Sequence, residues 1–180
     1  MIENERNIRK QLVMEAARRM AVAARTAPKG KGIDVIEIAI VTEEDILRLS
    51  EKMLQIAEEK GMKFFLRDAE NIKQADAILL IGTRQQVQGL NCFHCGFPTC
   101  AAKPEEVPCA INSIDVGIAI GSACATAADM RVDTRVMFSA GLAAQQLNYL
   151  GEGVGSIMAI PVSATSKNPF FDRKPKEAKV

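Results

Sequence analysis

The sequence predicts an α/β (α+β) domain in which helices flank a single central sheet. Segments with a helical repeat of apolar residues alternate with short β-branched segments along most of the chain. Of the 180 residues, 48% are apolar and 25% are charged, which is the composition of an ordinary globular protein. A chain of this length buries a sizeable core, so we expect residues 1–180 to form one domain.

The chain opens with a predicted helix and a predicted strand. In residues 4–25, apolar side chains recur at every fourth position from Ile8 to Ala24, and arginines occupy the other faces. Residues 26–32 contain one proline and two glycines, which end the helix. Residues 33–41 are β-branched and become continuously apolar, which predicts a central strand.

The next part of the chain is predicted to hold a second helix and two strands. Thr42 and Asp45 are spaced as an N-cap pair for this helix, and Gly61 closes it. Residues 62–66 are a candidate short strand. Residues 76–81, with the sequence DAILLI, predict a strand that is buried on both faces.

The last third of the chain repeats the alternation of helix and strand. Residues 111–130 predict a helix rich in Gly, Ala and Ser, which another backbone can approach closely. Residues 132–137 predict a strand, residues 139–150 a helix and residues 154–162 a final strand. We expect residues 163–180 to form an extended tail over the surface.

Charge and hydropathy exclude several classes of function. Twenty-three basic and 22 acidic side chains give a net charge of +1, which does not attract nucleic acid or an anionic membrane. The N-terminal residues are charged and lack the apolar segment of a signal peptide. The longest apolar tract, residues 116–128, is too short to span a bilayer. We therefore expect a cytoplasmic protein with reduced cysteines and with no nucleic-acid or membrane partner.

Residues 91–110, NCFHCGFPTCAAKPEEVPCA, hold four of the five cysteines. Cys92, Cys95, Cys100 and Cys109 have the spacing C-x2-C-x4-C-x8-C, which closes several short loops around one point. Iron–sulfur clusters are held by four thiolates, and the familiar spacings also combine gaps of two and four residues. We interpret the segment as a metal-binding loop and favour an iron–sulfur cluster.

Two other interpretations of the cysteines remain open. A structural zinc site prefers two close pairs of ligands, whereas this segment has one close pair, with the only histidine, His94, inside it. A disulfide framework is typical of small secreted domains. His94 is expected to pack or hydrogen-bond beside the metal site. Cys124 lies in a small-residue helix, where a cysteine commonly behaves as a small hydrophobe.

The motif N-C-x2-C-G-[FY]-P-T-C, followed by a further cysteine, resembles the 4Fe-4S motif in the small ferredoxin-type modules of corrinoid iron–sulfur proteins. All four cysteines of that motif are present, together with Gly96 and Pro98. Over its whole length, the chain resembles an uncharacterised prokaryotic family described as containing a ferredoxin domain. The resemblance implies one 4Fe-4S cluster in a ferredoxin-like loop.

Apart from the cysteines, the order of elements resembles the flavin-dependent nitroreductase fold. In that family a long first helix ends in a loop that touches flavin mononucleotide (FMN), and residues 24–41 stand in that position here. Residues 114–130 are similar to its small-residue helix near the flavin, and Arg173 and Lys174 to the segment that reaches the flavin phosphate. The sequence departs from the family at Lys29, where a serine is usual. The resemblance implies a homodimer with FMN at the subunit boundary.

The basic residues of this loop are candidates for binding the phosphate. The predicted cofactor-binding residues are Arg25, Lys29, Gly30, Lys31, Arg173 and Lys174. Their cationic groups, in a glycine-containing turn, are suited to charge-assisted hydrogen bonds with a phosphate. Alternatively, the basic residues complement the dipole of a solvated helix end.

Our preferred interpretation is a redox protein with one 4Fe-4S cluster, which passes single electrons between a donor and either a bound flavin or another protein. An electron donor or acceptor protein is the expected partner, and a flavin-dependent oxidoreductase of nitroreductase type is the expected enzyme class if FMN binds. The alternative is a zinc-stapled structural or binding protein without catalytic activity. The sequence identifies no catalytic residue.

Overall fold

A computed structural model describes residues 2–171 of the chain. The α-helices in this range are α1 (Glu5–Thr26), α2 (Glu44–Lys60), α3 (Phe64–Ile72), α4 (Ala110–Asp129) and α5 (Phe138–Gln146). The strands are β1 (Ile36–Val41), β2 (Ala77–Arg84), β3 (Asp133–Thr134) and β4 (Val154–Ser163). A 3-10 helix, η1 (Gly30–Gly32), follows α1.

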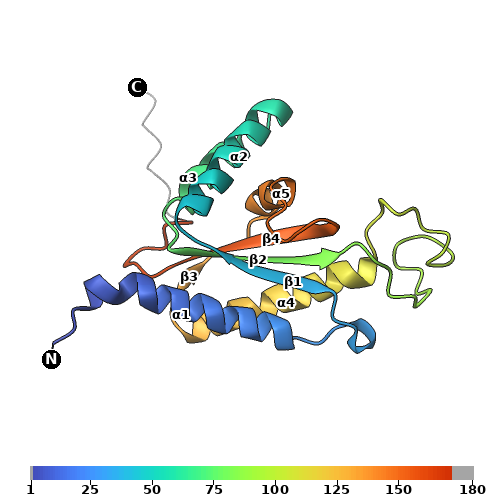
Figure 1. Cartoon of the computed structure of the whole chain (residues 1–180), viewed down its shortest axis with the longest axis horizontal. Helices are drawn as coiled ribbons and strands as arrows, with labels where there is room; N and C mark the ends of the chain where they lie inside the picture. Colours follow the sequence, from blue (N-terminus) through green and yellow to red (C-terminus); the bar gives the residue numbers. More distant parts are fainter. Residues whose placement is uncertain (1, 172–180) are drawn as a thin grey trace, which may run out of the picture.

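The four strands of the described range form one sheet in the order β1-β2-β4-β3, and every neighbouring pair is antiparallel. Helices α2, α3 and α5 cover one face of the sheet, and α1 and α4 cover the other (Figure 1). The predicted α/β class, with one central sheet flanked by helices, is confirmed.

Strand β2 lies in the middle of the sheet and is buried on both faces. Ile78 and Leu80 belong to the core beneath α2, α3 and α5, whereas Leu79 and Ile81 belong to the core against α1 and α4. Successive side chains of a strand point to opposite faces, so a strand covered on both sides needs an apolar residue at every position. Burying each such side chain contributes roughly 1.5–3 kcal/mol.

The predicted strand at residues 62–66 is wrong, because this segment begins helix α3. Phe65, Ala69 and Ile72 are fully buried in the core, and their spacing is that of one face of a helix. A short apolar run fits either a strand or a helical turn. Only the continuation of the repeat through Ala69 and Ile72 distinguishes the two.

The predicted Thr42 cap is also wrong. Glu43 is the N-cap residue of α2, and the main-chain carbonyl of Thr42 accepts a hydrogen bond from the Asp45 N–H (3.2 Å). The other end of the helix is as predicted, since Gly61 adopts the left-handed conformation (φ 65°) that terminates helices.

Several strand and helix ends differ from the predictions. Strand β1 begins at Ile36 and β2 ends at Arg84. Strand β3 consists of Asp133 and Thr134 only, and α5 ends at Gln146. Strand β2 continues through Gly82, which pairs with Glu37 of β1 and lies against side chains of β4. A Cβ atom at Gly82 would lie 2.8 Å from Ile157 Cγ1 and 3.0 Å from Val154 Cγ1.

The part of the predicted tail that the structure describes, residues 164–171, returns to the body of the protein. Phe170 is 1% exposed and belongs to the core on the α3 side. The prediction that this segment runs over the surface is therefore wrong at Phe170. Its carbonyl accepts hydrogen bonds from Asn71 (3.2 Å) and Arg135 (2.8 Å). The remainder of the tail lies outside the described residues.

Helix α4 is long and apolar enough to cross a membrane by length and composition alone, and within residues 2–171 it is the one such helix. Val116, Ala119 and Ala123 pack into the core against α1 and the sheet. On the other side of the helix, Ile114 and Ile118 remain 47% and 40% exposed. Only one face of this helix is therefore buried.

Replacing Gly141 by alanine tests the contact between α5 and β4. A Cβ atom at this position would overlap the Ile157 carbonyl and lie 2.9 Å from Met158 Cα, so the backbones must separate. We expect Gly141→Ala to lower the free energy of unfolding by about 2–3 kcal/mol, as overpacking does. Urea unfolding measures the change. The exposed Gln146→Ala in the same helix is the control and should change stability by less than about 0.5 kcal/mol; an equally mild effect of Gly141→Ala would contradict the close contact.

Candidate functional site

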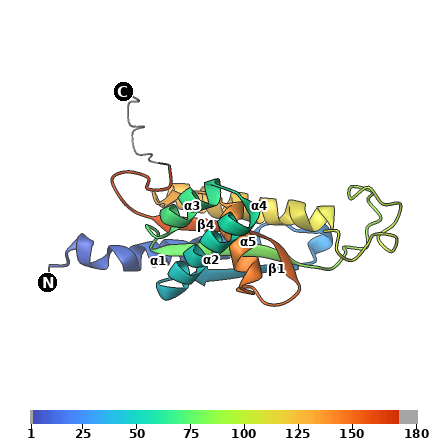
Figure 2. The same ribbon diagram turned by 90° about the horizontal axis from the view of Figure 1, so that it is seen from above.

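The predicted metal ligands lie in one segment, residues 91–110, which we call the cysteine loop. It joins the end of β2 to the start of α4 and projects beyond one end of the sheet (Figures 1 and 2). The end of α1 and η1 lie at the same end of the molecule (Figure 1). The cysteine loop thus begins and ends on elements that belong to the core.

The cysteines are among the less exposed residues of the cysteine loop. Cys92, Cys95 and Cys100 are partly buried, and all three are free thiols. Their neighbours His94 and Phe93 are exposed, the phenylalanine by 66%. Cys92 and Cys95 are therefore less exposed than the two residues between them.

Hydrogen bonds shape this part of the cysteine loop. The Cys100 N–H donates to Asn91 Oδ1 (2.8 Å), and the Asn91 N–H donates to Cys100 Sγ (3.4 Å). The Gly96 N–H donates to the Phe93 carbonyl (2.9 Å). Asn91, Phe93 and Gly96 have positive φ angles of 47°, 63° and 85°. Such changes of backbone handedness create the concavities of N–H groups that hold anions and iron–sulfur clusters.

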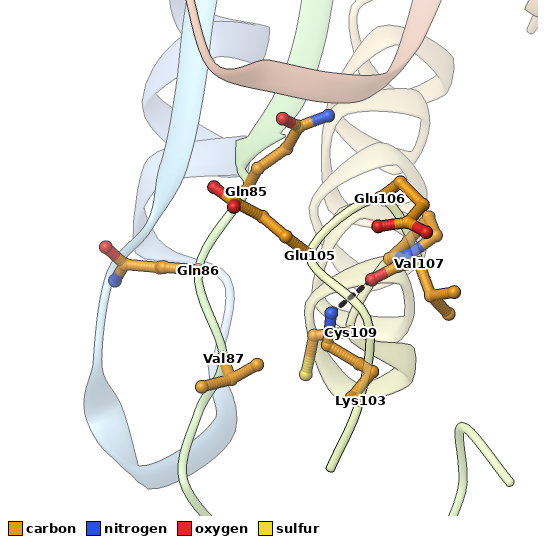
Figure 3. A pocket seen from close by; sticks show the side chains of 9 residues that line it. Gln85, Gln86, Val87, Lys103, Glu105, Glu106, Val107 and Cys109 are labelled. Carbon is orange, nitrogen blue, oxygen red and sulfur yellow. Dashed lines mark hydrogen bonds between the residues drawn. The ribbon is translucent and has the colours of Figure 1, made fainter. Parts of the chain in front are cut away.

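The fourth cysteine, Cys109, occupies a different place, at the N-cap position of α4. It lines a cavity of about 350 Å³ between the segment that follows β2, which carries Gln85 and Val87, and the loop residues before α4. Figure 3 shows Cys109 in this cavity, together with the hydrogen bond from Lys103 to the Val107 carbonyl that closes the turn before it.

The four thiols share a loop without forming a coordination site. In the part of the chain that the structure describes, no three His, Cys, Asp or Glu side chains converge as metal ligands. The donor set itself suits an iron–sulfur cluster, which requires four thiolates. A cluster on these four cysteines would require their sulfur atoms to approach one another.

The basic residues predicted to bind a phosphate form the second part of the candidate site. Arg25 donates to Asp34 Oδ2 (2.8 Å) and to the Ile36 carbonyl (2.7 Å). The Lys29 ammonium donates to the Ala24 carbonyl (3.1 Å) and the Arg25 carbonyl, and its side chain is 6% exposed. Lys29 therefore stabilises the C-terminal end of α1, in line with the helix-dipole interpretation, whereas Arg25 links that end to Asp34 and β1.

Gly30 and Lys31, in the segment that follows α1, contact residues on either side of the cysteine loop. The Gly30 N–H donates to both carboxylate oxygens of Asp115 in α4 (3.1 and 3.0 Å), and Asp115 is 3% exposed. Lys31 donates to the neutral carbonyl of Gln88 (3.2 Å), at the base of the cysteine loop. The predicted residues Arg173 and Lys174 lie outside the described residues.

Buried amide groups adjoin this connection. Gln88 and Asn112 are 4% and 1% exposed, and Asn112 Nδ2 donates to the Gln86 carbonyl (2.5 Å). Within residues 2–171, both polar atoms of the Gln88 amide and Asn112 Oδ1 have no hydrogen-bond partner. Leaving a buried polar atom unpaired costs about 1–3 kcal/mol.

Cys124 lies apart from the cysteine loop, on α4. Burial raises the pKa of its thiol, and a hydrogen bond with Thr134 opposes the rise only in part. A raised pKa disfavours the thiolate, which is the nucleophile and the metal ligand. This environment agrees with the interpretation of Cys124 as a packing residue.

Solved structures define the fold class. A nitroreductase with bound FMN from Desulfitobacterium hafniense is 16% identical, with a TM-score of 0.59 over 92% of this chain and 85% of that chain. An FMN-dependent nitroreductase from Clostridium difficile is 15% identical, with a TM-score of 0.55 over 85% of this chain and 76% of that chain. The predicted nitroreductase-like fold is thereby confirmed.

Sequence relatives define the family. An uncharacterized protein of Archaeoglobus fulgidus is 42% identical over 187 residues, which cover 98% of this chain and 100% of the relative. The profile of the family described as "Uncharacterized protein containing a ferredoxin domain (DUF2148)" matches residues 105–173. The chain belongs to this family, as its resemblance over the whole length indicated. The description of the family, which mentions a ferredoxin domain, supports a redox role, and these relatives give no support to zinc.

Sequence reasoning did not single out Gln88 and Asn112, which have no motif around them. It noted Asp115 only as the polar boundary of an apolar tract and within the helix that resembles the small-residue helix near the flavin. A carboxylate and an amide next to one another on an apolar helix are the available signal, because a helix packed on a core keeps such residues only where they meet a partner.

The pair formed by Asp34 and Arg25 predicts a loss of stability in acid. Partial burial alone would raise the pKa of Asp34, but hydrogen bonds from Arg25 and the Ile36 N–H, with the charges of Arg25 and Lys29, outweigh burial and lower it. A carboxyl with a lowered pKa stabilises the fold above its ordinary value of 3.8 and loses this contribution as the pH falls through the lowered pKa. Urea midpoints between about pH 6 and about pH 2.5 should fall less steeply in Asp34→Asn than in wild type. Arg25→Gln should flatten the profile in the same way, and wild-type steepness in both variants would rule out the pair as the source.

Proposed function

We propose that this protein is an iron–sulfur electron-transfer protein that carries one 4Fe-4S cluster on Cys92, Cys95, Cys100 and Cys109. The observation that carries the proposal is the cysteine loop itself, in which free, partly buried thiols accompany a backbone with repeated positive φ angles. When bound, such a cluster accepts and releases one electron at a time. A cytoplasmic setting, which keeps the thiols reduced, and an electron donor or acceptor protein as partner are parts of the proposal.

The residues of the chain have separate tasks in this proposal. Asn91 and Gly96 shape the turn that presents the first three cysteines. Cys109 contributes its thiolate at the N-terminus of α4, where the helix dipole favours negative charge. Phe97 is partly buried in the cysteine loop and adds apolar surface that excludes water.

FMN is the second cofactor that we propose, and the flavin would make the protein an oxidoreductase of nitroreductase type. The solved structures that share the fold include nitroreductases described with FMN. Of the predicted phosphate ligands, Lys31 fits best, because it donates to a neutral carbonyl. The unpaired atoms, which are Gln88 Nε2, Gln88 Oε1 and Asn112 Oδ1, offer one donor group and two acceptors for a polar ring edge. Arg25 and Lys29 keep the end of α1 in place rather than meeting the phosphate.

A homodimer through α4 belongs to the same proposal. The exposed face of this helix combines Ile114 and Ile118 with Gly117 and Gly121, and open space surrounds the position of a Cβ atom at both glycines. Small residues between apolar ones let a second backbone approach closely. A groove of about 420 Å³ between α4, α5 and β4 continues this apolar surface.

Metal analysis of anaerobically purified protein tests the cluster. We expect a brown protein with about four irons and about four sulfides per chain. Cys95→Ala should lose at least about nine-tenths of the iron, because a cluster with three protein ligands is labile. Cys124→Ala is the matched control, since Cys124 is a free cysteine outside the cysteine loop, and it should keep the iron. A colourless protein with one zinc, or equal iron in both variants, would refute the proposed cluster.

Flavin binding and association are tested with one substitution. After incubation with FMN and dialysis, we expect a dimer that retains about one FMN per chain and releases it on denaturation. Ile118→Glu places a charge on the exposed face of α4 and should give monomers in sedimentation analysis. The same variant should retain less FMN per chain after dialysis. Leu47→Glu changes a residue that is 51% exposed on α2, across the sheet, and should stay dimeric. A monomeric wild type rules out the dimer, and wild type that never retains FMN rules out the flavin.

A further inference from the structure

The two hydrogen bonds between Asn91 and Cys100 are the most specific contact that any predicted cluster ligand makes. Cys100 N–H donates to Asn91 Oδ1 at 2.8 Å, and Asn91 N–H donates to Cys100 Sγ at 3.4 Å. In each bond the backbone N–H of one residue donates to the side chain of the other, so the pair is reciprocal. It closes a ring of the chain that contains Cys92 and Cys95.

The backbone of Asn91 adds a requirement on residue type. Its φ of 47° lies in the left-handed region, which glycine adopts freely and asparagine and aspartate tolerate better than other residues. Among these three, only asparagine and aspartate also supply an oxygen that accepts the Cys100 N–H. The position therefore combines a backbone conformation with an acceptor in a way that few side chains satisfy.

The contact to sulfur has a chemical consequence. Hydrogen bonds from N–H groups to ligand sulfurs tune the potential of iron–sulfur centres, because they stabilise the extra negative charge of the reduced state. The Asn91 N–H is aimed at Cys100 Sγ because the side-chain bond holds the two residues side by side. Losing the side-chain oxygen therefore loosens the bond to sulfur as well.

We propose that Asn91 is a positioning residue that fixes Cys100 as a cluster ligand before metal binds and raises the potential of the cluster by its N–H bond to the sulfur. The inference rests on the proposed iron–sulfur function. It adds a residue that contributes no ligand atom and acts entirely through Cys100.

Two substitutions at Asn91 separate its backbone from its side chain. Asn91→Gly keeps the left-handed conformation and removes the acceptor, whereas Asn91→Asp keeps an acceptor oxygen. In metal-free, reduced protein, hydrogen exchange of the Cys100 amide should be at least about tenfold faster in Asn91→Gly than in wild type, and near wild type in Asn91→Asp. After reconstitution, Asn91→Gly should lose iron faster to a chelator and have a lower reduction potential, and Asn91→Asp should restore retention.

A remote asparagine provides the matched control. Asn4 Oδ1 also accepts a main-chain N–H, that of Arg6 (3.0 Å), at the start of α1. Asn4→Gly removes the same kind of bond far from the cysteine loop and should leave exchange at Cys100, iron retention and potential unchanged.

The outcomes distinguish this inference from the function on which it rests. Wild-type exchange, iron retention and potential in Asn91→Gly would overturn the role of Asn91 while wild type still loads a cluster. Wild-type protein that never loads iron would overturn the proposed function and the role of Asn91 with it. Faster exchange at Cys100 and a lowered reduction potential in Asn91→Gly, but not in Asn91→Asp or Asn4→Gly, would support the inference.

Discussion

Strand β2 carries apolar side chains on both of its faces because helices cover the sheet from both sides. This double burial fixes the positions of the other elements. Antiparallel pairing with β1 and β4 holds β2 at the centre, and the alternation of Ile78 and Leu80 with Leu79 and Ile81 divides the core into two layers. A shift of one residue would exchange the two layers, so the register is tightly specified.

The candidate site lies where this rigid strand ends. Arg84 is the last residue of β2, and the chain next enters the cysteine loop, which returns to the core at α4. The bonds from Gly30 to Asp115 and from Lys31 to Gln88 fasten the end of α1 to both edges of that loop. The base of the cysteine loop is therefore held by three core elements, while its tip projects outward. This arrangement suits a redox centre that must be held by the protein and remain accessible to a partner.

The site was predictable where chemistry is local. Cys92, Cys95 and Cys100 stand out by residue type and spacing, and the structure shows a free, partly buried cysteine at each of these positions. Arg25 and Lys29 were predictable as cations beside a helix end but not as groups already engaged by Asp34 and by main-chain carbonyls. Those partners depend on how the chain turns through η1, where Lys31 adopts a positive φ of 56°. Asp115, Gln88 and Asn112 gain their meaning only from neighbours distant in sequence.

The sequence by itself determined the helices with long repeats, the buried strands and the family motif, because periodicity and cysteine spacing are properties of the chain alone. Tertiary structure decided the rest. The segment at residues 62–66 became a helix because its repeat continues to Ile72 in the core beneath the sheet, and β2 ran through Gly82 because β4 occupies the space of a side chain there. It also decided that one face of α4 packs on α1 while Ile114 and Ile118 stay exposed. The pattern of apolar residues in the sequence indicates which side chains become buried, whereas the rest of the fold supplies the elements that cover them.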